Sequence, residues 1–101
     1  MSNTRKATKP SAAILDEYTI EFEGETYTIT REDMDDLDLM LMFANGNVMG
    51  AVMQLVGAED WKRFEDSVRT DKGKIPMTKA KQFIDKIADG PLGNFASSLG
   101  S

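Results

Sequence analysis

The chain has 101 residues and a net charge of −5, and it contains no cysteine and no histidine. This length leaves room for one domain, and the missing cysteines exclude a disulfide framework and thiolate chemistry. Without histidine or cysteine the commonest general base, the usual thiol nucleophile and the usual zinc ligands are absent, so we expect neither an enzyme nor a cofactor. The acidic balance argues against nucleic acid as a partner, because such binding needs clustered lysine and arginine.

The negative charge is concentrated in one part of the chain. Between residues 16 and 38 there are ten acidic residues and one basic residue, Arg31. Such a stretch either steers a basic partner or is simply a solvated surface. No apolar run is long enough to span a bilayer, and no charged start precedes an apolar segment, so neither a membrane span nor a signal peptide is expected. The absence of cysteine fits a reducing cytoplasm.

The first part of the chain contains two successive segments with different residue patterns. Residues 1–14 are polar, lack periodicity and include Pro10, which predicts a disordered arm. From residue 18 to residue 29, apolar and polar residues alternate, with many β-branched and aromatic types, which predicts a β-hairpin. A two-residue turn at Glu23-Gly24 would place Ile20 opposite Tyr27 on the face that packs against helices.

Helical periodicity follows the hairpin. Thr30, followed by Glu32 and Asp33, predicts an N-cap with acidic residues in the first turn. The four expected helices run over residues 31–44, 48–56, 59–68 and 78–87. They are separated by Asn45-Gly46-Asn47, Gly57 and a polar loop over 70–76, with Thr78 as the last N-cap and Gly90-Pro91 as the stop.

The fold class expected from these elements is mainly α (α+β), an N-terminal hairpin packed on a small bundle of about four helices. The domain boundaries are an arm over 1–14, a single domain over 15–90 and a flexible tail over 91–101. The first helix presents an apolar stripe of Met34, Leu37, Leu41 and Ala44. The residues expected in the core are Ile20, Tyr27, Leu37, Leu41, Trp61, Phe64, Phe83 and Ile87.

Two polar motifs have alternative interpretations. The acidic run Asp33, Asp35, Asp36 and Asp38 lacks the central glycine and closing glutamate of a calcium loop, so no metal site is expected. Asp66-Ser67-Val68 is similar to the serine motif of acyl carrier proteins, with Ser67 as the attachment site of a small acidic carrier or adaptor domain. The simpler interpretation is a surface serine beside a core valine.

Methionine is concentrated in the helices that follow the hairpin. Its flexible, polarisable side chain suits surfaces that accept varied helical partners, although core packing is the more common role. The first helix is apolar around much of its girth, which favours contact with a partner or with a second copy. The residues of this hypothetical protein-binding surface are Met34, Met40, Met42, Phe43, Met49 and Met53.

Taken in order, these features resemble the tail assembly chaperones of long-tailed, siphovirus-type phages that infect actinobacteria. The resemblance covers residues 18–98 and rests on the order and general residue character of its segments. Its pieces are the hairpin over 22–29, the leucine-rich acidic helix, Ala51–Trp61, Phe83–Ile87, and the closing Gly93-Asn94 and Ala96-Ser97-Ser98.

The resemblance implies a function in viral tail assembly. Such chaperones bind the helical tape measure protein in the host cell cytoplasm, keep it soluble, recruit tail tube protein and leave before the tail is finished. No catalytic, cofactor-binding or metal-binding residue carries over. The family commonly makes a longer product by ribosomal frameshifting, and Leu92-Gly93-Asn94 is compatible with slippery codons, in a place where we expect an extension to leave the fold undisturbed.

Overall fold

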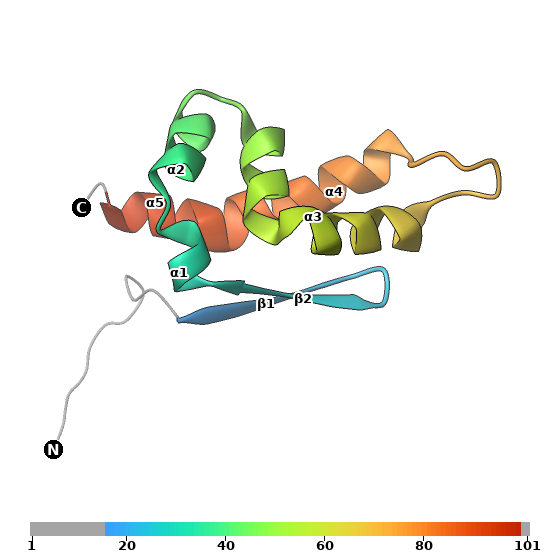
Figure 1. The fold of residues 1–101 in the computed structure, drawn as a ribbon, viewed down its shortest axis with the longest axis horizontal. Coiled ribbons are helices and arrows are strands. Elements are labelled where there is room, and N and C mark those ends of the chain that lie inside the picture. Colours follow the sequence, from blue (N-terminus) through green and yellow to red (C-terminus); the bar gives the residue numbers. More distant parts are fainter. Residues whose placement is uncertain (1–15, 100–101) are drawn as a thin grey trace, which may run out of the picture.

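An antiparallel hairpin begins the part of the chain that the structure describes, and helices cover one of its faces (Figure 1). The computed structural model describes residues 16–99. Its strands are β1 (Glu17–Phe22) and β2 (Glu25–Thr30), and its helices are α1 (Arg31–Met34), α2 (Leu37–Ala44), α3 (Val48–Val68), α4 (Met77–Ile87), the π-helical turn η3 (Ala88–Leu92) and α5 (Gly93–Leu99). The expected fold class, a hairpin packed on about four helices, is confirmed. The predicted arm over 1–14 lies outside the described residues.

The hairpin has the predicted register. Ile20 pairs with Tyr27 and Tyr18 with Ile29. The two turn residues, Glu23 and Gly24, both have positive φ angles of 49° and 80°, as the tight hairpin turn that matches strand twist requires. Ile20, Tyr27 and Ile29 are buried, whereas Thr19, Glu21, Thr26 and Thr28 on the other face are exposed.

The predicted helix over residues 31–44 is divided. Thr30 caps α1 in a capping box with Asp33, as expected, but α1 ends after one turn. Asp36 then acts as a second N-cap, because its Oδ1 accepts a hydrogen bond from the Asp38 backbone N at 3.0 Å. Aspartate competes with helical backbone bonding in this way and favours caps over helix interiors.

The interruption changes which side of α2 faces the core. Leu39 is fully buried, while Leu37 and Leu41 are 73% and 50% exposed. The prediction that Leu37 and Leu41 lie in the core is therefore wrong, because the helix breaks at Asp35-Asp36 and restarts with a different side toward the core.

Helix α3 contains a sharp kink at Gly57, whose φ of 86° and ψ of 161° lie in a region that essentially only glycine adopts. The predicted separation of two helices at this residue is confirmed. The second half of α3 runs along the hairpin and packs beside α4 (Figure 1).

The core is built around packed aromatic rings from the hairpin, α3 and α4. Tyr27, Phe64 and Phe83 are fully buried, and Phe22 packs at their edge. The rings of Phe64 and Phe83 are stacked, with centroids 4.3 Å apart. Trp61, which was expected inside, is only partly buried and contacts Phe64 at 5.0 Å between centroids. The predicted burial of Ile20, Tyr27, Phe64, Phe83 and Ile87 is confirmed.

The end of the chain differs from the prediction in two ways. Helix α4 starts after Pro76, with no side-chain cap, so Thr78 is not its N-cap. The predicted interruption at Gly90-Pro91 is present as a kink, because Gly90 has non-helical φ and ψ angles of −91° and −107° within η3 and Pro91 has no N–H to donate. Helix α5 then follows with Leu92 and Phe95 buried, so the segment predicted as a flexible tail over 91–101 is instead packed on the fold as far as Leu99.

Candidate protein-binding surface

The six residues of the predicted surface occupy different environments. Met34 is fully buried and belongs to the core, so its assignment to a contact surface is wrong. Met40, Met42 and Phe43 are partly buried and pack against the core. Only Met49 and Met53, in the first half of α3, are exposed, at 43% and 40%.

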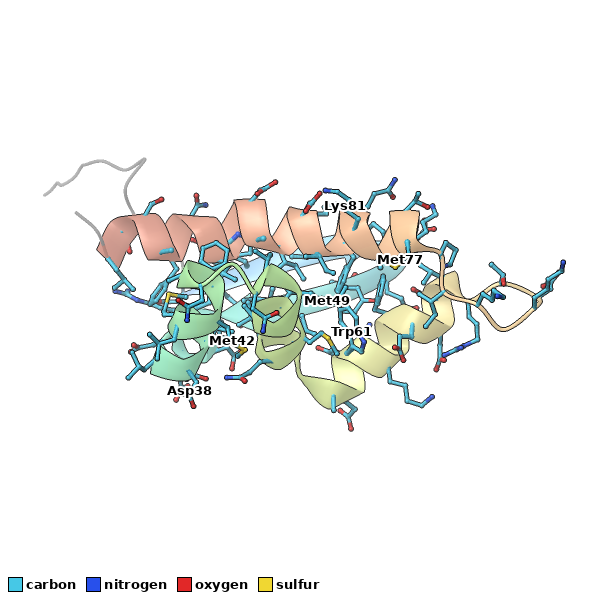
Figure 2. All side chains as sticks on the ribbon, turned by 90° about the horizontal axis from the view of Figure 1, so that it is seen from above. Asp38, Met42, Met49, Trp61, Met77 and Lys81 are labelled. Atoms are coloured by element: carbon cyan, nitrogen blue, oxygen red, sulfur yellow. The ribbon has the colours of Figure 1, made fainter. Side chains whose placement is uncertain are left out.

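The kink in α3 creates a depression beside these methionines. Its lining residues are Met53, Gln54, Ala58, Trp61, Lys62 and Glu65. Met53 comes from before the kink and Trp61 from after it, so Gly57 brings the two apolar side chains into one concave surface. The Trp61 indole Nε1 donates to Glu65 Oε2 at 3.1 Å, which orients the ring at the rim. Seen from above, Met49 and Trp61 both lie on the visible face of α3 (Figure 2).

Among residues 16–99, four other large apolar side chains are exposed, and the predicted surface did not include them. Leu37 and Leu41 are on α2, Met77 is the first residue of α4, and Leu99 is near the end of α5. The second cap at Asp36 was the signal for Leu37 and Leu41, because a restarted helix takes a new phase. Met77 and Leu99 gave no such signal in the sequence.

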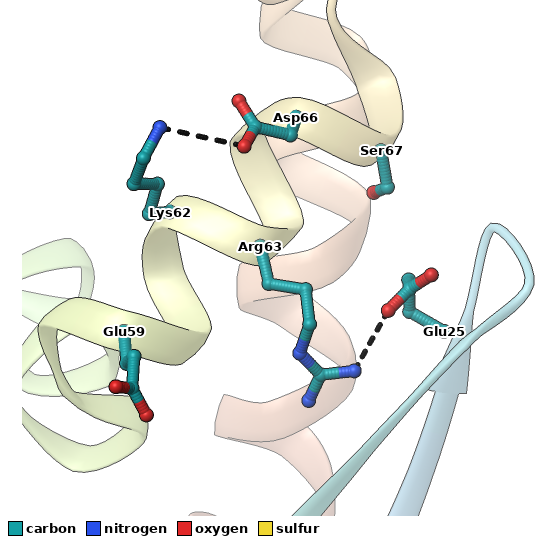
Figure 3. A pocket seen from close by; sticks show the side chains of 6 residues that line it. All are labelled: Glu25, Glu59, Lys62, Arg63, Asp66 and Ser67. Carbon is teal, nitrogen blue, oxygen red and sulfur yellow. Dashed lines mark hydrogen bonds and ion pairs between the residues drawn. The ribbon is translucent and has the colours of Figure 1, made fainter.

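A second depression lies between α3 and the hairpin turn (Figure 3). Its lining residues are Glu25, Glu59, Lys62, Arg63, Asp66 and Ser67. Arg63 is the centre of the arrangement. Its guanidinium binds Glu25 at 2.8 Å and Asp60 at 3.1 Å, and it donates to the Thr26 carbonyl at 2.8 Å. The carboxylates of Glu25 and Asp60 raise the pKa of Arg63, with Glu25 as the larger cause.

The guanidinium of Arg63 also lies 4.5 Å from the centre of the Tyr27 ring, a cation–π distance. These contacts of Arg63 are all with residues of the same chain. We therefore interpret the depression as the place where Arg63 links α3 to the hairpin, and not as a ligand site.

Ser67 does not have the geometry that a carrier domain needs. It is in the last turn of α3, is partly buried, and its Oγ donates to the Phe64 carbonyl at 2.7 Å. A carrier serine would open a helix and be free for attachment. The alternative interpretation of Ser67 thus gains no support from the position of the residue.

Two side chains of the acidic run, those of Asp33 and Asp36, act at helix N-termini. Asp33 completes the capping box with Thr30, and Asp36 both caps α2 and accepts a hydrogen bond from Gln54 Nε2 at 3.1 Å. Within residues 16–99, no group of three or more acidic side chains is arranged to hold a metal ion. Across the same part of the chain, no helix combines the length and apolar character needed to span a bilayer.

Comparisons with known proteins found no similar protein. No family model matches the chain, and neither the curated proteins nor the solved structures contain a significant match.

Proposed function

We propose that this chain is a tail assembly chaperone of a long-tailed phage. In this function it binds the helical tape measure protein in the host cytoplasm, keeps that protein soluble and helps to recruit tail tube subunits. The order of hairpin, acidic leucine-rich helix and later helices motivates the proposal, together with the absence of histidine and cysteine.

The observation that carries the proposal is the apolar depression on α3. Met53 lines this depression with Trp61, and Met49, one helical turn before Met53, is also exposed. Methionine adapts its shape to different neighbours, and a tryptophan at a rim offers a large surface with little loss of rotamer freedom. A chaperone that holds successive segments of a long helical client needs this adaptability.

The charges around the depression define how a client helix would be held. Lys62 and Glu65 lie at its rim, and Gln54 adds an amide. An apolar client side chain would enter beside Met53 and Trp61, while polar residues on its flanks would meet the rim. This arrangement is that of a helix docked in a shallow groove.

The test is co-expression with the tape measure protein encoded in the same gene cluster. The parent chain should raise the soluble fraction of that protein and should co-purify with it. The double variant Met49→Glu with Met53→Glu should lose both effects while its circular dichroism and melting temperature stay near those of the parent. Leu99→Glu is the matched control, because Leu99 is 62% exposed but lies on α5.

Two outcomes would contradict the proposal. If the tape measure protein is equally soluble with and without the chain, the function is wrong. If the control variant loses the solubilising effect to the same extent as the methionine variant, that effect is a nonspecific apolar association and the α3 depression is not the site.

A further inference from the structure

The outer side of α2 presents an apolar stripe that nothing in the described fold covers. We define the α2 stripe as Leu37, Leu41 and Ala44, which recur at steps of four and three residues and so lie on one side of a helix. All three are exposed, Leu37 at 73%. Leu39, the buried residue of α2, points about 200° away from Leu37 at the rotation of an α-helix.

The stripe is unusual because of the helix that carries it. Asp38 is the single polar residue of α2, whose sequence is LDLMLMFA. An eight-residue helix with one polar side chain would normally be enclosed, since a helix that is apolar all round is typical of a buried position. Here only Leu39 is buried, so most of the apolar surface of α2 is at least partly open to solvent.

The charges beside the stripe have one sign. Glu32, Asp33, Asp35, Asp36 and Asp38 lie within seven positions, and no lysine or arginine occurs from residue 32 to residue 61. The neighbouring Arg31 is 3.9 Å from Asp16. Among residues 16–99, no cationic side chain forms an ion pair with Glu32, Asp35 or Asp38.

We infer that the α2 stripe docks a basic amphipathic helix of a partner protein, with leucine-type residues at helical spacing and lysine or arginine on either side. The apolar residues of the partner would cover Leu37 and Leu41, and its cations would supply the charge that α2 lacks. A second copy of this chain fits poorly, because pairing α2 with itself would bring two clusters of acidic residues together. The stripe is separate from the residues that line the α3 depression, so this inference does not depend on the tail assembly function.

The test uses the full chain and two synthetic amphipathic peptides that share their leucine positions. One peptide carries lysine at its polar positions and the other carries glutamate. Fluorescence anisotropy should show binding of the lysine peptide and little binding of the glutamate peptide. The affinity for the lysine peptide should fall as salt is added, because salt screens exposed charges.

Three variants separate apolar docking from general attraction to an acidic protein. Leu37→Ser with Leu41→Ser should weaken binding of the lysine peptide about tenfold or more. Asp35→Asn with Asp38→Asn should weaken it less and reduce its salt dependence. Met77→Ser should bind like the parent, because Met77 is 71% exposed but begins α4, near the other end of the molecule (Figure 1). Circular dichroism should show that all three variants are folded.

The inference is overturned by any of four results. These are equal binding of the two peptides, unchanged affinity after the leucine substitutions, a dimer of the parent chain that those substitutions dissociate, and peptide binding that appears only when residues 1–15 are deleted. The third result would assign the stripe to a second copy, and the fourth to the N-terminal segment of the chain itself.

Discussion

The ring of Phe64 on α3 lies nearly parallel to the ring of Phe83 on α4, at 4.3 Å between centroids and 9° between planes. Both rings are fully buried, and Phe22 and Tyr27 of the hairpin contact Phe83 at 5.5 and 4.9 Å. One aromatic pair therefore joins the two helices to the strand layer.

Replacing Phe64 with alanine should destabilise the domain by about 3–5 kcal/mol, because it removes a large buried ring and leaves a cavity. Urea unfolding followed by circular dichroism measures the change. Trp61→Ala is the comparison, and it should cost clearly less, since Trp61 is only partly buried. An equal loss in the two variants would mean that Trp61 belongs to the centre of the core.

Gly57→Ala should destabilise the domain by about 1–3 kcal/mol, because its backbone angles exclude a Cβ atom on conformational grounds. In the described part of the chain no atom lies within 4 Å of the position that a Cβ would take, so the cost would arise from backbone strain and not from collision. The same variant should also disturb the depression between Met53 and Trp61. Ala58→Gly, at the next position, is the control and should cost no more than about 1 kcal/mol. A Gly57→Ala variant as stable as the parent would show that the kink is not fixed by this residue.

The hairpin could be predicted in detail because its information is local. Alternation identified the buried face, and a two-residue turn left one register, in which Ile20 faces Tyr27. Gly57 was equally informative, since a glycine between two periodic segments predicts a break. These features need no knowledge of distant parts of the chain.

The errors occurred where a local signal competed with another. Asp36 acts as a cap in the middle of an apolar run, so Leu37 and Leu41 point outward and Leu39 inward. Gly90-Pro91 does interrupt the helix, but the chain resumes in α5 because Leu92 and Phe95 are buried, so no flexible tail begins there. The candidate surface was only partly predictable, because the same periodicity places Met34 in the core and Met53 at the surface.

Tyr27→Phe should change the stability at neutral pH by no more than about 1 kcal/mol, and it should stabilise the domain at alkaline pH. The Tyr27 hydroxyl is buried and has no hydrogen-bond partner among residues 16–99, while the nearby Ser67 hydroxyl donates to the Phe64 carbonyl. Burial raises the pKa of Tyr27 above 10.0, and the nearby Ser67 hydroxyl and Arg63 guanidinium partly oppose this rise.

The folded protein therefore holds the phenol proton more tightly than the unfolded chain does. Its contribution to stability is complete below pH 10.0 and is lost as the pH rises through the higher folded-state pKa. Urea unfolding at neutral and alkaline pH should show a smaller alkaline loss for Tyr27→Phe than for the parent. Tyr18→Phe, which removes the other tyrosine hydroxyl of the chain, is the control. A neutral-pH loss well above 1 kcal/mol would instead indicate that the Tyr27 hydroxyl has a hydrogen-bond partner such as Ser67.

Phe95→Ala should destabilise the domain by about 3 kcal/mol, although Phe95 lies only six positions before Ser101. Phe95 is 5% exposed and Leu92, one turn earlier, is fully buried. Leu99→Ala is the control, and because Leu99 is exposed it should change the stability by no more than about 0.5 kcal/mol.

The same geometry constrains a frameshifted product. Leu92-Gly93-Asn94 lies at the junction of η3 and α5, so a change of reading frame there would replace Phe95 and the rest of α5. A longer product should keep the stability of the shorter one only if its new sequence supplies an apolar residue at position 95. Sequencing the gene downstream in the other frame and comparing the melting temperatures of the two products tests this. A longer product with a polar residue at that position and an unchanged melting temperature would show that α5 is dispensable for the fold.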